Sequence, residues 1–178
     1  MRRIARLLVV LVPVALPADA GMIAAQAVER PAWLAVDTAT RTATIAVEVT
    51  APSGSPSALL NGFREGGVQV IVPLGWTIRW NWVSNDSTAP HSLVVGPERE
   101  KLPERAQDPG FPNAMTRNAL TGLGAGRRDA TAFEADQTGW FWMYCGVPEH
   151  ALRGEWIGLR VSAQAKEPEI MVKGKEAP

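Results

Sequence analysis

Residues 140–150 read Trp-Phe-Trp-Met-Tyr-Cys-Gly-Val-Pro-Glu-His, an aromatic run that ends in a cysteine. Aromatic and β-branched residues favour strands, so Gly139–Tyr144 is predicted to be a strand. The Gly-Val-Pro sequence at 146–148 is typical of a turn and ends the strand near Cys145. This turn brings His150 back beside the cysteine. The stretch therefore predicts a strand and a tight loop that carries two residues able to bind a metal.

Similar short segments recur on both sides of this stretch, and no sustained helical periodicity lies between them. Glycine, proline, serine and asparagine clusters separate the segments. Many short strands with turns between them predict an all-β protein, an antiparallel sandwich or barrel. The other expected strands are Trp33–Asp37, Thr42–Thr50, Val68–Val72, Trp76–Val83, His91–Val95, Asp129–Glu134 and Glu155–Ala163.

Residues 96–118 do not follow the strand pattern, because they are charged and contain four prolines. Loops of this length are uncommon in a domain and are either functional or poorly ordered. We expect a long loop between the strand that carries His91 and the later strands. A short helical turn at Glu98–Arg105 is compatible with its composition.

The N-terminus has the features of an export signal. Arg2, Arg3 and Arg6 precede an apolar run, Leu7–Leu16, and small residues with two Ala-x-Ala sites follow. We interpret residues 1–27 as a signal peptide, with an uncleaved N-terminal anchor as the alternative. The apolar run is short for a membrane span. The expected location is periplasmic or otherwise extracytoplasmic, either secreted or membrane-anchored.

About 150 residues remain, enough for one domain, which we place at residues 28–165, followed by a flexible tail at 166–178. Without residues 1–27 the chain has 15 basic and 17 acidic residues. So weak a net charge argues against nucleic acid or an anionic bilayer as the main partner.

Cys145 is the only cysteine of the chain. Exported proteins usually use cysteines in disulfide pairs, and a single cysteine cannot form an internal bridge. An exposed thiol would also be open to oxidation. These points favour a metal ligand or a nucleophile over the alternative, a buried and inert thiol.

The only two histidines, His91 and His150, complete a set of metal-binding residues with Cys145. Cys145 and His150 form a C-x4-H pair on one loop, and His91 follows the loop Asn85–Pro90. Two imidazoles and one thiolate match the trigonal plane of a blue-copper site, which also has a weak axial ligand. We expect these three residues to bind one copper ion that cycles between Cu(II) and Cu(I). The alternative is an inert core cysteine with surface histidines.

The loop Cys145-Gly-Val-Pro-Glu-His150 resembles the copper loop of cupredoxins, and most of all that of the sulfocyanin and rusticyanin group. The resemblance extends over roughly Asn61 to Val161. It implies a Greek-key β-sandwich, a mononuclear copper centre and one-electron transfer. The other segments that carry it are Asn61-Gly-Phe, Val68-Gln-Val-Ile-Val-Pro-Leu-Gly-Trp76, Pro90-His91-Ser92 and Pro112–Gly126.

Glu155 stands where the group it resembles has its axial methionine, since that group's loop reads C-x4-H-x4-M. Met143 is no substitute, because it lies two residues before Cys145 on the same strand and is expected to point into the core. Glu155 could bind copper, or turn to solvent and leave the copper three-coordinate or open to water, or belong to a site unlike the family's. We favour the axial ligand. A carboxylate is a hard, charged ligand, so it favours Cu(II) and lowers the potential.

Residues near the ligands are expected to support them. Ser92 follows a ligand histidine and could donate a hydrogen bond to the Cys145 sulfur, which would raise the potential. Asn81 or Asn85 could link the two loops that carry the ligands. The alternative for such residues is that they satisfy backbone groups in turns.

The aromatic strand has a second face, opposite to Met143 and Cys145. Trp140, Trp142 and Tyr144 share that face because side chains alternate along a strand. We expect the N-terminal strand region, Trp33–Val49, to cover these three side chains. The alternative is an exposed aromatic patch that docks a redox partner.

These features predict an electron carrier and not an enzyme. The Gly122–Gly126 run lacks the residues of a phosphate-binding loop, and no other catalytic group stands out. Redox proteins such as cytochromes or membrane oxidases are the expected partners, with an N-terminal tether to the membrane as an option. The alternatives are a copper-handling module and a small copper redox enzyme with an open site.

Overall fold

Alternating burial defines the two longest strands. In β2 (Thr42–Thr50) and β5 (Thr77–Ser84), every second side chain points inward and is buried, while those between them face outward or lie part-buried. This period of two is what a sheet with one covered face requires. The inward residues of β5 include Trp80 and Trp82, which supply much of the core volume.

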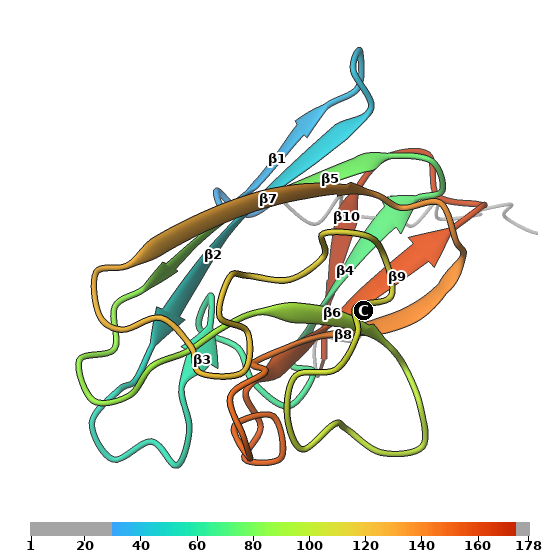
Figure 1. Ribbon diagram of the computed structural model, residues 1–178. Helices are drawn as coiled ribbons and strands as arrows, with labels where there is room; N and C mark the ends of the chain where they lie inside the picture. The colour runs from blue at the N-terminus through green and yellow to red at the C-terminus, as the bar shows by residue number, and fades with distance from the viewer. Residues whose placement is uncertain (1–29, 174–178) are drawn as a thin grey trace, which may run out of the picture.

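The computed structural model describes residues 30–173, and these form two packed sheets (Figure 1). The first sheet has the order β1-β2-β5-β7, with β3 paired to β2. The second has the order β10-β4-β9-β8-β6. The remaining bounds are β1 Leu34–Asp37, β3 Leu59–Leu60, β4 Val68–Pro73, β6 Val94–Pro97, β7 Arg128–Glu134, β8 Gly139–Tyr144, β9 Trp156–Ser162 and β10 Glu169–Val172.

The all-β, Greek-key sandwich expected from the sequence is confirmed, but its sheets are not purely antiparallel. β2 runs parallel to β5, and β4 runs parallel to β9. The members of each pair are not consecutive in the chain, since β3 and β4 lie between β2 and β5, and β5 to β8 lie between β4 and β9. The sequence pattern carries no information on such pairings, because each strand alternates in the same way whatever its partner's direction.

The long connection between β6 and β7 is built into the core. Its Phe111 side chain is buried and lies 5.1 Å from the ring centre of Phe133 and 4.6 Å from that of Phe141. Two further hydrogen bonds attach the connection to β6, from Gly110 N–H to the Val95 carbonyl and from Val95 N–H to the Ala114 carbonyl. The expected long loop is therefore present, and it is well packed. The prediction of a short helical turn at Glu98–Arg105 is wrong, because that segment forms bends and no helix.

The same connection covers the outer face of β8, which corrects the expectation that Trp33–Val49 does so. Trp142 and Tyr144 form a second apolar cluster with residues of the connection and of the loop after β8. Strands β1 and β2 lie in the other sheet. Trp140 stays half-exposed, with the Arg160 guanidinium 4.9 Å from its ring centre.

Two strands, β3 and β10, were not expected, and β10 corrects the prediction of a flexible tail. Glu169–Val172 pairs with β4, and Ile170 and Val172 pack against the core. The tail prediction is therefore wrong for these residues. The expected signal peptide, residues 1–27, lies outside the described residues. Within residues 30–173, no helix is long and apolar enough to cross a membrane.

The aromatic contacts of Phe111 predict that the long connection contributes to global stability. Phe111→Ala leaves a cavity between the sheets and is expected to lower the free energy of unfolding by about 3–5 kcal/mol. Urea denaturation measures this change. The matched control is Leu120→Ala, at a half-exposed position of the same connection, with an expected change within about 0.5 kcal/mol. Equal, small changes for both variants would contradict a core role of the connection.

Candidate metal centre

The pairing of β8 with β9 places two candidate ligands side by side. Tyr144 and Trp156 are partners in the antiparallel register, so Cys145 and Glu155, the next residues outward, lie at the same end of the pair. The Cys145 N–H donates to the Glu155 carbonyl at 3.1 Å. The loop between them turns back on itself, and the Glu155 N–H donates to the His150 carbonyl at 3.1 Å. One hairpin therefore presents Cys145, His150 and Glu155 together.

His91 comes from a different part of the fold and is fixed through its backbone. Its N–H donates to the Leu123 carbonyl at 3.1 Å, and the Leu123 N–H donates back to the His91 carbonyl at 2.7 Å. Gly122 permits this close approach, because a Cβ there would lie 2.8 Å from the His91 nitrogen, and its φ is +75°. The Gly122–Gly126 run is thus structural, as its sequence indicated.

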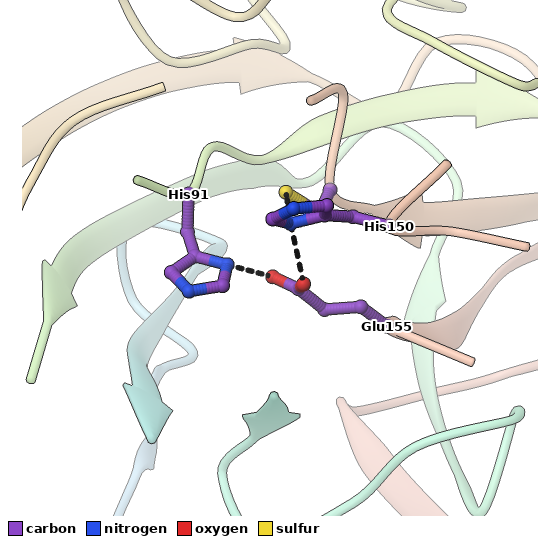
Figure 2. A group of neighbouring side chains, drawn as sticks. His91, His150 and Glu155 are labelled. Carbon is purple, nitrogen blue, oxygen red and sulfur yellow. Dashed lines mark hydrogen bonds and ion pairs between the residues drawn. The ribbon is translucent and has the colours of Figure 1, made fainter. Parts of the chain in front are cut away.

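The four side chains converge on one point. The Glu155 carboxylate lies between the two imidazole rings (Figure 2), with Oε1 2.8 Å from Nδ1 of His91 and Oε2 3.1 Å from Nδ1 of His150. The Cys145 Sγ is 3.5 Å from the same His150 nitrogen. One donor atom from each residue lies within 4.8 Å of all the others.

This geometry corrects one of the alternatives for Glu155. The side chain does not turn to solvent, since only 1% of it is exposed and it bonds to both histidines. Met143 is buried in the apolar core, as expected, and takes no part in the cluster. Two nitrogens, one sulfur and one carboxylate oxygen at this spacing fit a copper ion.

The cluster is closed to solvent except at one residue. Cys145 is fully buried, and the side chains of His91 and Glu155 are 2% and 1% exposed. The His150 side chain is 15% exposed. A pocket of about 170 Å³ borders this side of the site, between residues 51–58, residues 86–91 and the loop that carries His150 and Arg153.

Burial and charge shift the pKa values of the cluster in opposite directions. Burial raises the pKa of the Cys145 thiol, and the charge of Glu155 raises it further. Burial would also raise the pKa of Glu155, but hydrogen bonds with His150 and His91 outweigh it and hold this pKa below its ordinary value. Burial would lower the pKa of His91, but Glu155 and Asp86 outweigh it and raise this pKa. The carboxylates therefore favour a protonated His91 until a cation replaces the proton.

Ser92 contacts the sulfur, chiefly through its backbone. The Ser92 N–H donates to the Cys145 Sγ at 3.3 Å, while its hydroxyl oxygen lies 3.8 Å from the sulfur. The hydroxyl donates instead to the Ala119 carbonyl at 2.7 Å and accepts from the Gly146 N–H at 2.9 Å. Ser92, and neither asparagine, thus links the two loops that carry the ligands.

The asparagine prediction is wrong, and the residue that follows Asn85 was missed. Asn81 faces outward from β5, and Asn85 donates to Glu48 at 2.5 Å. The neighbour of Asn85, Asp86, is 4% exposed, and its Oδ2 lies 2.7 Å from Nε2 of His91. In the sequence, the only indication of a role for Asp86 was its place five residues before the candidate ligand His91. The sequence does not show that the Asp86 carboxylate points toward the His91 ring, because the fold of the loop decides this.

Comparison with known proteins gives one family match. The family model described as the sulfocyanin (SoxE) domain matches residues 31–172, which is nearly all of the described chain. No curated protein matches the chain.

Solved structures of other proteins are similar to part of the chain. A copper nitrite reductase from Nitrosomonas europaea is 18% identical with a TM-score of 0.50, over 68% of this chain and 41% of that one. Auracyanin from Roseiflexus castenholzii is 20% identical with a TM-score of 0.48, over 72% and 99%. Rusticyanin from Thiobacillus ferrooxidans is 20% identical with a TM-score of 0.45, over 73% and 86%.

The β-sandwich and the group of nitrogen, sulfur and oxygen donors agree with the family match. The chain belongs to the sulfocyanin domain family of the cupredoxins, and its cofactor is one copper ion.

Proposed function

We propose that the protein carries single electrons between extracytoplasmic redox partners, and that His91, Cys145, His150 and Glu155 hold its copper ion. The observation that carries the proposal is a buried four-donor cluster from which only His150 reaches the surface. A bound copper ion supplies a one-electron Cu(II)/Cu(I) couple. The protein's contribution is to hold the donors, exclude water and provide a short path to a partner.

The donors are held by the backbone on both sides of the site. Cys145 and Glu155 flank a hydrogen-bonded strand pair, and His91 is fixed by its two bonds to Leu123. Little of this framework can move when the charge of the site changes. Rigid donors favour fast electron transfer, because few atoms must rearrange. His150 supplies the edge through which an electron would enter or leave.

A small copper redox enzyme is the second candidate, and the pocket beside the site favours it. The pocket borders His91, His150 and Glu155, so a small molecule bound there would lie near the metal. The burial of His91 and Glu155 favours the carrier, since only 2% and 1% of these side chains are exposed. An exogenous ligand that changes the magnetic resonance spectrum of the Cu(II) protein would support the enzyme instead.

The proposed setting is extracytoplasmic. The basic and apolar N-terminal residues 1–27 support export, and the single cysteine matches a protein that uses its thiol for metal binding. Cytochromes or membrane oxidases are the proposed partners. Absence of the protein from the extracytoplasmic fraction of its cell would contradict this setting.

Loading with Cu(II) is expected to produce a strong thiolate-to-copper absorption band. Cys145→Ala is expected to remove the band completely, because the thiolate is one of its two partners. Stoichiometric reduction should bleach the band with one electron per protein. Glu149→Gln, on the same loop but exposed and outside the cluster, is the matched control and should keep the band. A wild-type protein without this band would overturn the proposal.

Replacing the candidate axial ligand is expected to change the reduction potential. Glu155→Met removes a charged donor that favours Cu(II), so the potential should rise by roughly 60 mV or more, equivalent to a tenfold shift toward Cu(I). Protein-film voltammetry measures the potential. Glu155→Gln, which keeps the size and loses the charge, should also raise it. An unchanged potential in both variants would show that Glu155 does not act on the copper.

The stability of the copper-free protein is expected to fall at both ends of the pH range. The pKa of His91 is raised in the fold, so its contribution is present below its ordinary value of 6.5 and is lost as the pH rises through the raised value. The pKa values of Glu155 and Asp86 are lowered, so their contributions are lost as the pH falls below about 4.

With copper bound, the stability should rise instead of fall toward high pH. Copper competes with a proton for His91 and therefore binds more tightly as the pH rises. Chemical denaturation between about pH 3 and pH 8, with and without copper, measures the loss of stability at both ends of the range. Copper-free stability that keeps rising up to pH 8 would contradict the role of the carboxylates around His91.

A further inference from the structure

We propose that Asp86 is a positioning residue for the metal centre: it fixes the ring of His91 and strengthens its donation, and thereby favours Cu(II) without binding the metal itself. The inference rests on the proposed copper ligation by His91. It concerns a residue outside the four-donor cluster.

The contact between Asp86 and His91 defines the state of the ring. Oδ2 of Asp86 is 2.7 Å from Nε2, and both side chains are buried. A carboxylate can only accept a hydrogen bond, so Nε2 must carry the proton. The other ring nitrogen, Nδ1, faces Glu155 on the far side of the ring. Once a cation replaces the proton on Nδ1, Asp86 keeps the remaining proton on Nε2, and the lone pair of Nδ1 points into the donor cluster.

Asp86 is itself held in place by a turn. Its Oδ1 accepts hydrogen bonds from the Thr88 N–H at 2.7 Å and from the Thr88 hydroxyl at 2.6 Å. The preceding residue, Asn85, donates its N–H to the Val49 carbonyl at 2.8 Å, which attaches the loop to β2. The carboxylate thus cannot swing away from His91 without breaking this turn.

The two oxygens of Asp86 have different hydrogen-bond partners, which argues against a purely structural role. A turn of this kind needs one acceptor atom, and Oδ1 fills that need. Within residues 30–173, Oδ2 bonds to His91 alone. A second buried oxygen aimed at a candidate ligand is what a carboxylate–histidine–metal relay requires.

The negative charge of Asp86 favours Cu(II) over Cu(I). A carboxylate that accepts from Nε2–H makes the imidazole a stronger donor at Nδ1. Two hydrogen bonds from Thr88 and one from His91 reach the two oxygens of Asp86, so the charged form is the one that can accept all three. Asp86 therefore stays negative and stabilises the more positive oxidation state.

The two histidines are treated differently by the fold. His91 has a buried carboxylate on its second nitrogen, whereas the His150 ring has its hydrogen-bond partners in the described chain on Nδ1 only and reaches solvent. We infer that His91 tunes the site, while His150 is the side open to the exterior.

The experiment compares Asp86→Asn with wild type. The amide keeps the size but lacks the charge, and its single oxygen can accept either from Thr88 or from Nε2–H of His91. Cu(II) affinity is expected to fall about 10- to 100-fold. If Cu(I) affinity is unchanged, a tenfold loss of Cu(II) affinity raises the reduction potential by about 59 mV. Glu48→Gln is the control, because it removes a carboxylate bonded to Asn85 that does not touch His91. Its potential should stay at the wild-type value.

Nitrogen NMR of the histidines in the wild-type Cu(I) protein tests the same inference without a variant. The expected result is a protonated, slowly exchanging Nε2 on His91. An unprotonated Nε2 would overturn the inference, as would an Asp86→Asn protein that keeps its thiolate band, Cu(II) affinity and potential. In both cases the proposed electron carrier would stand. A wild-type protein that lacks the thiolate band would overturn both proposals.

Discussion

The antiparallel pairing of β8 with β9 is the constraint on which the metal centre depends. Its register places Cys145 and Glu155 next to each other, and the loop between them returns so that the Glu155 N–H bonds to the His150 carbonyl. A shift of one residue would turn one of the two side chains to the opposite face of the sheet. The apolar residues of β8 and β9 prevent that shift, because they are buried in the core in one register only.

The buried polar cluster is stable because its members compensate one another. Burying a carboxylate without a partner is costly, but Glu155 bonds to both histidines and Asp86 bonds to His91 and Thr88. The same contacts orient the donor atoms before any metal binds. Removing one member would leave the others unpaired, so the cluster acts as one unit.

The alternation of apolar residues predicted most strands, including β2 and β8 with their observed bounds. The pattern could not show that β2 pairs in parallel with β5, since alternation is the same for either direction. It also missed β10, whose short Glu169–Val172 segment is a strand only because β4 offers an open edge. The long connection looked irregular, and its anchor, Phe111, is recognisable only from the aromatic rings that surround it.

At the metal centre, the sequence by itself determined the chemistry of the donors. A single cysteine, two histidines and the C-x4-H-x4-E spacing can be read from residue identity alone, and the resemblance to the family adds that Glu155 stands where a methionine is usual. Only the tertiary structure decided that Glu155 faces inward and that Asp86 bonds to the second nitrogen of His91. It also decided that His150 is the one member of the four-donor cluster that reaches solvent. Side-chain direction and burial arise from contacts between segments far apart in the chain, and spacing within one segment does not contain them.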